Sequence, residues 1–230
     1  MALKRTSLPR TAEAVALAEL RDAIVRGDLA PGTQIRQTAA AQELGLSVIP
    51  VREALKTLAG EGIVTYVPQR GYTVTELTPR SVDGIFRIRE LLESEAEANA
   101  AARLRPEDIA AMRAAVDAQR AATAAADVPA VIAANRGFHF ALLARCDNDW
   151  LLRFVTQLWE ALEPHRALSY RRAAVAGDSA RAEAILTEHD GIVTAFEDGA
   201  AARALRLLAG HRTQGRADFH RLLGATEPTG

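Results

Sequence analysis

The sequence is poor in several features that would place it in a specialised class of protein. Its single cysteine, Cys146, excludes a framework of internal disulfides. Only 5% of the residues are aromatic while alanine is abundant, a balance that favours helices over sheets. No apolar run is long enough to cross a bilayer, and the N-terminus has no signal-peptide core. We therefore expect a cytoplasmic protein that makes no membrane contact.

An excess of charge of one sign is also missing. The formal net charge is −1, which argues against a general nucleic-acid coat but leaves room for a local basic face. Residues 1–76 carry nine Lys and Arg against eight Asp and Glu, and the rest carries nineteen against twenty-one. Charge alone therefore decides nothing, whereas an apolar content of 49% is enough to bury the cores of two compact domains.

The first third of the chain has the pattern of three helices followed by a hairpin. Residues 1–10 are predicted to form a flexible basic arm, and helices are predicted over 11–26, about 37–44 and about 48–60, with Ser47 as N-cap of the last. After Gly62 the period changes, and β-rich runs over 63–67 and 72–75 flank a turn signal. This order predicts a winged helix-turn-helix over 11–76.

Nothing beyond residue 78 has the pattern of a strand. Helices are predicted near 79–103, 106–125, 128–146, 148–175, 179–198 and 200–222. We expect a short linker over 77–80 and an all-helical domain over 81–223. The predicted fold class is mainly α, an N-terminal winged helix-turn-helix plus a C-terminal all-α helical bundle.

The third helix divides its faces as a DNA-recognition helix must. An apolar stripe is formed by Val51, Ala54, Leu55 and Leu58, and the opposite side carries Val48, Arg52 and Lys56. Arg52 suits a guanine edge or a phosphate and Lys56 a phosphate, while Gln69 and Arg70 at the hairpin tip could reach a neighbouring groove. A merely solvated helix face is the alternative, but the preceding turn, the N-cap and the wing favour DNA.

Three histidines of the second half form a candidate metal site. Asn135 and His139 are four residues apart on one predicted helix, and His189 and His211 lie on two later helices. Their imidazoles could converge inside a bundle and bind Zn, Ni, Cu or Fe, although a single histidine is more often a packed or surface residue. His165 and His220 are interpreted as solvated or helix-capping residues.

The N-terminal motifs resemble the DNA-binding domain of the GntR family over about 65 collinear residues. The resemblance is carried by Gly27–Gly32, Leu44–Ser47, Pro50–Leu55, Leu58, Glu61-Gly62 and Gly71. It implies that DNA is contacted by Ser47, Val48, Ile49, Arg52, Lys56, Gln69, Arg70 and Gly71. Val48 and Ile49 stand where the family usually has arginine and threonine, and Gln37 replaces a common glutamate. These departures point to a different operator, read more through thymine methyl groups.

Residues 80–222 resemble the ligand-sensing domain of the FadR-type branch of that family. The resemblance is carried by Arg89 with Leu92-Glu93, Phe138-His139, Asn148, Glu188-His189 and Gly210-His211. It implies a divalent metal, zinc or nickel, on His139, His189 and His211, which helps to hold a small organic acid. Asn135 stands where many members have aspartate, so its amide oxygen is a weaker donor.

Arg89 is the residue we expect to pair with the effector's carboxylate, and an intrahelical salt bridge to Glu93 is its alternative role. Trp159, Arg166 and Tyr170 are further possible neighbours of the pocket, for which no prediction is made.

The leading hypothesis is a homodimeric regulator that binds a double-stranded DNA operator and whose affinity is shifted by the effector. A metal-dependent helical enzyme is one alternative, but no general base is evident apart from Glu188, whose neighbour His189 points about 100° away. A constitutive regulator without an effector is the other, and Asn135 keeps it open.

Overall fold

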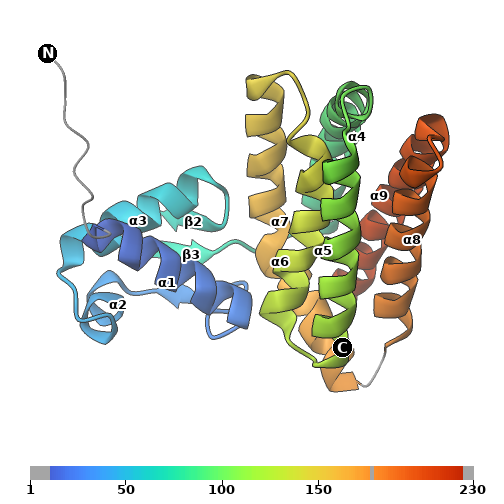
Figure 1. Ribbon diagram of the computed structural model, residues 1–230. Helices are drawn as coiled ribbons and strands as arrows, with labels where there is room; N and C mark the ends of the chain where they lie inside the picture. The colour runs from blue at the N-terminus through green and yellow to red at the C-terminus, as the bar shows by residue number, and fades with distance from the viewer. Residues whose placement is uncertain (1–10, 177–178, 225–230) are drawn as a thin grey trace, which may run out of the picture. The chain divides into compact units, whose positions relative to one another are not determined.

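The computed structural model describes residues 11–176 and 179–224. The chain divides between Glu76 and Leu77 into two compact units. Each unit has its own buried apolar side chains, and the helices of each unit can be followed in Figure 1. The predicted fold class, a winged helix-turn-helix followed by a helical bundle, is confirmed.

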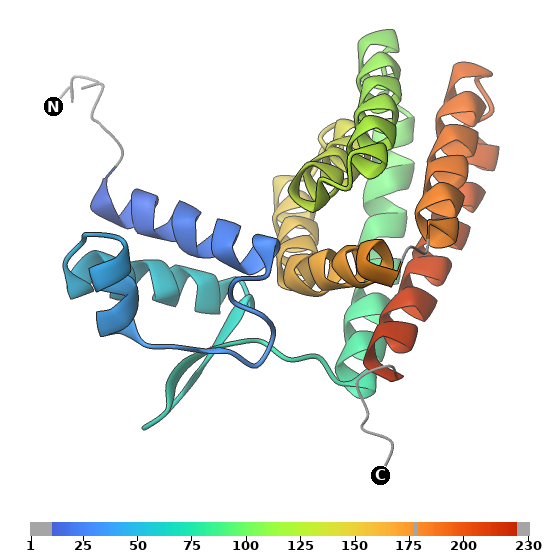
Figure 2. The same ribbon diagram turned by 90° about the horizontal axis from the view of Figure 1, so that it is seen from below.

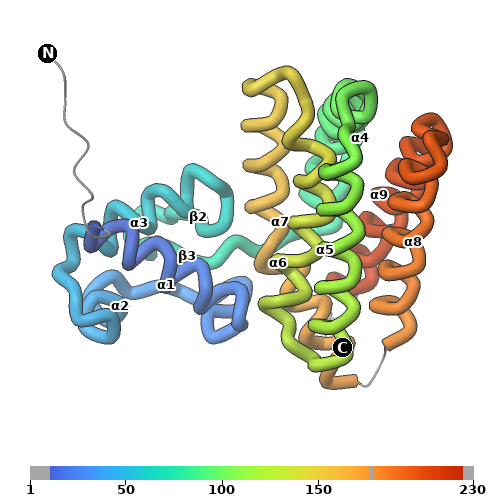
Figure 3. Tube along the Cα trace, viewed as in Figure 1, coloured from blue at the N-terminus to red at the C-terminus, as the bar shows by residue number. Residues whose placement is uncertain are grey.

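The first unit is a three-helix core with a small antiparallel sheet. Its elements are α1 (Ala12–Arg26), β1 (Gln34–Ile35), α2 (Gln37–Glu43), α3 (Val48–Gly60), β2 (Val64–Val67) and β3 (Gly71–Val74). The strand order is β1-β3-β2, and Tyr66 pairs with Tyr72 across the hairpin. The path of the chain through α1, α2 and α3 can be followed in Figure 3.

Local signals explain where the first unit's helices begin and end. Thr11 caps α1 by accepting a hydrogen bond from the backbone N–H of Ala14, and Gly27 ends the helix at φ +92°, a conformation that favours glycine. Ser47 occupies the N-cap position of α3 as predicted, but its side chain makes no capping hydrogen bond. Strand β1 was not predicted, because two residues are too short to show a period of two.

The second unit is all-helical over its described residues. Its helices are α4 (Pro79–Ala101), α5 (Pro106–Ala124), α6 (Val128–Leu143), α7 (Asp149–Ala176), α8 (Ala180–Glu197) and α9 (Ala201–Gly224). Proline lies at the first helical position of α4 and α5, where its missing N–H costs nothing. Helices α8 and α9 lie side by side in both views of Figures 1 and 2. Helix α9 also packs against α4.

A buried polar layer lies within this bundle and centres on Glu93 of α4. The Glu93 carboxylate accepts hydrogen bonds from Arg89 at 2.6 and 3.1 Å, from the Trp159 indole at 2.9 Å and from Arg212 at 3.2 Å. Arg212 also donates to Glu97 at 2.6 Å. Burial opposes ionisation of Glu93, yet Arg89 and Arg212 hold its pKa below the ordinary value. At Glu97 burial prevails over the attraction of Arg212 and raises the pKa to about 7.

His165 of α7 was predicted to be solvated or helix-capping, and that prediction is wrong. Its side chain is 2% exposed, and within the described residues neither ring nitrogen has a hydrogen-bond partner. Burial lowers the His165 pKa to about 4, so the ring is neutral near pH 7. His220 does lie near the surface, where its Nε2 contacts Asp83 at 2.8 Å.

Removing Arg212 should destabilise the second unit strongly. We expect Arg212→Met to lower the free energy of unfolding by about 3 kcal/mol, because two buried carboxylates lose their shared counter-charge. Arg216→Met, one turn further along α9, removes a half-exposed ion pair with Asp83 and should leave the urea midpoint essentially unchanged. Urea unfolding of the metal-free proteins measures both, and equal losses in the two variants would contradict the role assigned to the buried layer.

Candidate metal centre and candidate DNA-reading surface

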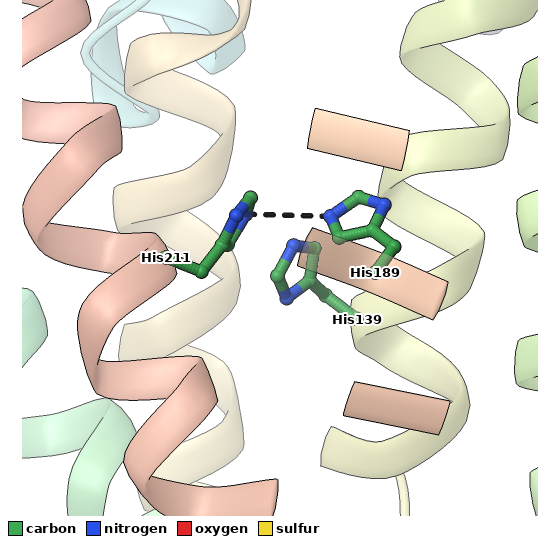
Figure 4. Close-up of side chains that lie close together, drawn as sticks. All are labelled: His139, His189 and His211. Atoms are coloured by element: carbon green, nitrogen blue, oxygen red, sulfur yellow. Dashed lines mark hydrogen bonds between the residues drawn. The ribbon is translucent and has the colours of Figure 1, made fainter. Parts of the chain in front are cut away.

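The three histidines singled out in the sequence converge inside the second unit. His139 comes from α6, His189 from α8 and His211 from α9, and their ligand nitrogens all lie within 4.8 Å of one another. Figure 4 shows the imidazole rings of His189 and His211 facing each other, with that of His139 close by. His139 is 6% exposed and His189 is fully buried, so this group of polar rings is enclosed by protein.

The outer nitrogens of two of these rings are held by partners on other residues. His189 Nδ1 lies 2.9 Å from the amide oxygen of Gln119, and His211 Nδ1 lies 2.5 Å from a carboxylate oxygen of Glu188. An amide oxygen and a carboxylate only accept, so both Nδ1 atoms donate. Each Nε2 of a neutral ring therefore presents its lone pair to the interior.

This orientation leaves a place for one cation between the rings. The Nε2 atoms of His189 and His211 are 3.3 Å apart, and burial keeps the pKa of His189 well below its ordinary value. Two facing lone pairs need either a proton or a metal ion between them. A proton would satisfy that pair alone, whereas Nε2 of His139 is also buried without a hydrogen-bond partner in the described part of the chain. A metal ion accounts for all three nitrogens.

The separation between the His189 and His211 nitrogens fits a small divalent ion. Zinc binds imidazole nitrogen at about 2.0–2.1 Å, so two nitrogens on a tetrahedral ion lie about 3.4 Å apart. The separation of 3.3 Å between His189 and His211 is close to that value. Asn135 lies one turn before His139, is 4% exposed and lines the same cavity, where its amide oxygen could serve as a weak donor.

The cavity beside the histidines has a volume of about 110 Å³. Its polar lining combines histidine, arginine and carboxylate side chains, and its apolar lining is mainly aromatic and aliphatic. The lining residues are Phe86, Arg89, Glu93, Glu97, Asn135, His139, Trp159, Arg166, Ser169, Tyr170, Ala173, Arg181, Ala182, Ile185, Leu208, His211, Arg212, Gly215, Asp218 and Phe219.

Arg89 lines this cavity, but its guanidinium is already engaged. It donates to both oxygens of Glu93, which is the intrahelical salt bridge given above as the alternative to effector binding. Trp159, Arg166 and Tyr170, for which the sequence allowed no prediction, also line the cavity. Gln119 was missed altogether, because nothing in its spacing distinguishes it from other polar residues of a helix.

Glu188 is not placed to act as a general base. It accepts from His211 at 2.5 Å and from Arg181 at 2.6 Å. Partial burial opposes ionisation, yet these two hydrogen bonds hold the Glu188 pKa below its ordinary value. Its carboxylate therefore positions His211. Both of its oxygens already accept hydrogen bonds from the protein, so neither is placed to take a proton from a substrate.

In the first unit, α3 exposes the face that the sequence assigned to DNA. Val51, Ala54, Leu55 and Leu58 are fully buried, while Val48 is 39% and Ile49 65% exposed. The Arg52 side chain is half exposed, and Lys56 is similarly exposed while it contacts Glu53 at 2.9 Å. The division of the helix into an anchored face and an exposed face is thus as predicted.

The hairpin tip adds a second exposed group. Gln69 and Gly71 adopt positive φ angles of 68° and 83°, and Arg70 between them is exposed. Gln34 of β1 donates its side-chain N–H to the carbonyl of Arg70, which ties the tip to β1. The wing is therefore a structured turn that presents Gln69 and Arg70 to solvent.

A winged helix-turn-helix followed by a helical domain, with a cavity lined by histidine, arginine and carboxylate groups among apolar ones, defines a class, the DNA-binding transcription regulators. Residues 11–74 match the family described as bacterial regulatory proteins, gntR family, and residues 84–214 match the FCD domain family. The chain belongs to the GntR family of bacterial transcription regulators and carries an FCD domain.

Two curated relatives from Escherichia coli K12 illustrate the similarity. The HTH-type transcriptional regulator McbR is 33% identical over 146 residues, which cover 64% of this chain and 66% of McbR. The HTH-type transcriptional repressor GlaR is 26% identical over 199 residues, which cover 74% of this chain and 88% of GlaR. The solved structure of E. coli McbR/YncC aligns with a TM-score of 0.78 at 26% identity and covers 92% of this chain and 98% of its own. The family and its relatives are regulators and not enzymes. In the described part of the chain, no helix has both the length and the apolar character needed to span a membrane.

Proposed function

We propose that this regulator binds a double-stranded DNA operator as a homodimer in the cytoplasm, and that a small organic acid bound beside a divalent metal ion changes its operator affinity. Repression is the mode we expect, since GlaR and the gluconate operon repressor of Bacillus subtilis are named repressors. The observation that carries the proposal is the convergence of three histidine nitrogens beside a cavity of the helical domain that His139 and His211 line. A cavity of this kind is what a ligand sensor requires and what a constitutive regulator does not need.

DNA reading is assigned to α3 and the wing. Arg52 offers a planar fork for a guanine edge and Lys56 a charge for a phosphate, while exposed Val48 and Ile49 suit contact with thymine methyl groups. Ser47, Gln69, Arg70 and Gly71 are assigned to backbone contacts beside these residues.

Substituting Arg52 should weaken operator binding more than loss of one positive charge explains. On a duplex enriched by the wild-type protein from a random library, we expect Arg52→Ala to bind about tenfold or more weakly, and Lys56→Ala to bind more weakly with a shallower salt dependence. Arg26→Ala removes the same charge from an exposed position at the end of α1 and is the matched control. Fluorescence anisotropy at several salt concentrations measures all three, and equal binding by Arg52→Ala and Arg26→Ala would refute the assignment.

A homodimer is supported by an unpartnered apolar patch on two adjacent helices. Ile88 and Leu91 of α4 are 46% and 56% exposed, and Trp150 and Phe154 of α7 are 67% and 50% exposed. Arg103, just after α4, pairs with Asp147, just before α7, so the two packed helices run in opposite directions, with Trp150 and Phe154 nearer this shared end than Ile88 and Leu91. Exposed aromatic and aliphatic groups on two neighbouring helices are typical of a subunit interface.

Charge placed in this patch should separate the subunits. We expect the Leu91→Glu, Phe154→Glu double variant to have the mass of a single 24.7 kDa chain in light scattering, because carboxylates would be buried across the interface. The wild-type protein and Val175→Glu, whose altered residue is 91% exposed elsewhere on α7, should have twice that mass. A dimeric double variant, or a monomeric wild-type protein, would rule out this interface.

Zinc or nickel would be held by His139, His189 and His211, with Asn135 as a weaker oxygen donor, and would offer an open Lewis-acid position to a carboxylate oxygen. Gln119 and Glu188 keep Nε2 of His189 and His211 directed inward. Phe138 stacks on His189 at 4.0 Å between ring centroids and Trp159 lies 4.6 Å from the His139 ring, so apolar rings shield the site from water.

The wild-type protein, reloaded with zinc and desalted, should retain about one metal ion per chain. Inductively coupled plasma mass spectrometry measures the metal content. His139→Ala should lose it, because it removes the nitrogen that has no other partner. His220→Ala, which removes a histidine paired with Asp83 outside the cluster, should keep it. Failure of the wild-type protein to retain zinc or nickel would refute the proposed metal-assisted site and would not affect the DNA-binding assignment.

A further inference from the structure

Four arginines line the cavity beside the histidines, and three of them are neutralised. Arg89 pairs with Glu93, and Arg212 pairs with Glu93 and Glu97. Arg181 pairs with Glu188 and Asp218 at 2.6 and 2.8 Å. Each of these guanidinium groups has its counter-ion within the protein, so none of them needs a ligand for charge balance.

Arg166 of α7 is different. Among the described residues it has no carboxylate within 4.0 Å and no hydrogen bond, and its guanidinium carbon lies 4.4 Å from the centre of the Trp159 ring. Burial, and then repulsion by Arg89, lower the Arg166 pKa to about 10, so the side chain is still a cation at neutral pH. A cation that is partly withdrawn from water without a counter-ion is costly, and a bound anion would relieve that cost.

Two hydroxyl groups accompany Arg166 on the same face of α7. Ser169 and Tyr170 follow it by three and four residues, which places all three side chains together, and all three line the cavity. The Tyr170 oxygen accepts from the Gln119 amide at 3.4 Å, which leaves its own O–H to donate. Ser169 has no side-chain hydrogen bond within the described residues. This group of three donors has the composition of an anion site.

We propose that Arg166, Ser169 and Tyr170 form a second anion subsite, and that the effector is a short dicarboxylate held at both ends. This inference rests on the proposed effector function and deepens it. One carboxylate lies at the histidine cluster and the other is bound by the donors of α7. Charge supports two carboxylates: Arg166 has no carboxylate partner of its own among the described residues, and a divalent ion would add two further positive charges. The cavity of about 110 Å³ has room for an acid with a short chain.

Succinate and butyrate test the second subsite, because both acids have four carbons but succinate has two carboxylates and butyrate only one. Calorimetry at pH 7.5 on the full chain reloaded with zinc should show succinate binding at least about tenfold more tightly than butyrate. Arg166→Gln should lose about tenfold or more in succinate affinity while its butyrate affinity stays within about threefold, so the preference disappears. The preference should persist in weaker form without metal, since the contact to Arg166 does not involve the ion.

Matched variants separate recognition from folding. Arg206→Gln removes the same charge from an exposed position of α9 and should keep the preference, while Arg166→Lys should restore part of it. Tyr170→Phe and Ser169→Ala should each lower it without altering any charge, and thermal melts of the acid-free proteins report whether each variant is folded.

The outcomes distinguish this subsite from the effector function itself. Equal binding of the two acids by the wild-type protein, or an unchanged preference in both Arg166→Gln and Tyr170→Phe, overturns the second subsite and leaves the effector site in place. Binding of neither acid by the zinc-loaded wild-type protein overturns the effector function and the subsite together.

Discussion

The ionised carboxylate of Glu93, buried between three helices, is the constraint on which the second unit depends. It is 2% exposed and receives hydrogen bonds from Arg89 of α4, Trp159 of α7 and Arg212 of α9. A buried charge is tolerated only when such partners are held in place, so the separation and register of the three helices are fixed at this level. Arg212 follows His211 directly, and the same contacts therefore help to place a histidine of the candidate metal site.

How far the sequence predicts this structure depends on the range of the interactions involved. Periodicity and Gly or Pro signals act within a few residues, so the helices and the hairpin could be placed within a few residues of their observed bounds. The two residues of β1 have too short a pattern. The burial of His165 and the salt bridge of Arg89 depend on packing. Spacing alone gave a wrong prediction for His165 and left the role of Arg89 open.

The candidate site shows the same limit. His139, His189 and His211 could be named from their resemblance to a known family, but their approach to within 4.8 Å results from the packing of α6, α8 and α9. Gln119 has no local signal, because its role exists only through His189, 70 residues away. Arg166 is distinguished by the lack of a carboxylate partner among the described residues, and that lack depends on how the helices pack and has no signal in the sequence.

Helices α4 and α9 give a physical route by which a ligand in the cavity could influence the chain as a whole. Helix α4 begins two residues after Leu77, where the second unit starts, and lines the cavity through Phe86, Arg89 and Glu93. Helix α9 supplies His211 and Arg212 to the cavity and binds Asp83, near the start of α4, through Arg216 and His220. Under the proposed function, a ligand that holds His211 in one position would therefore favour one arrangement of α9 against α4. Under that function it would shift the regulator only by the difference between its affinities for the two arrangements, so selectivity for the effector and the extent of regulation would arise from the same contacts.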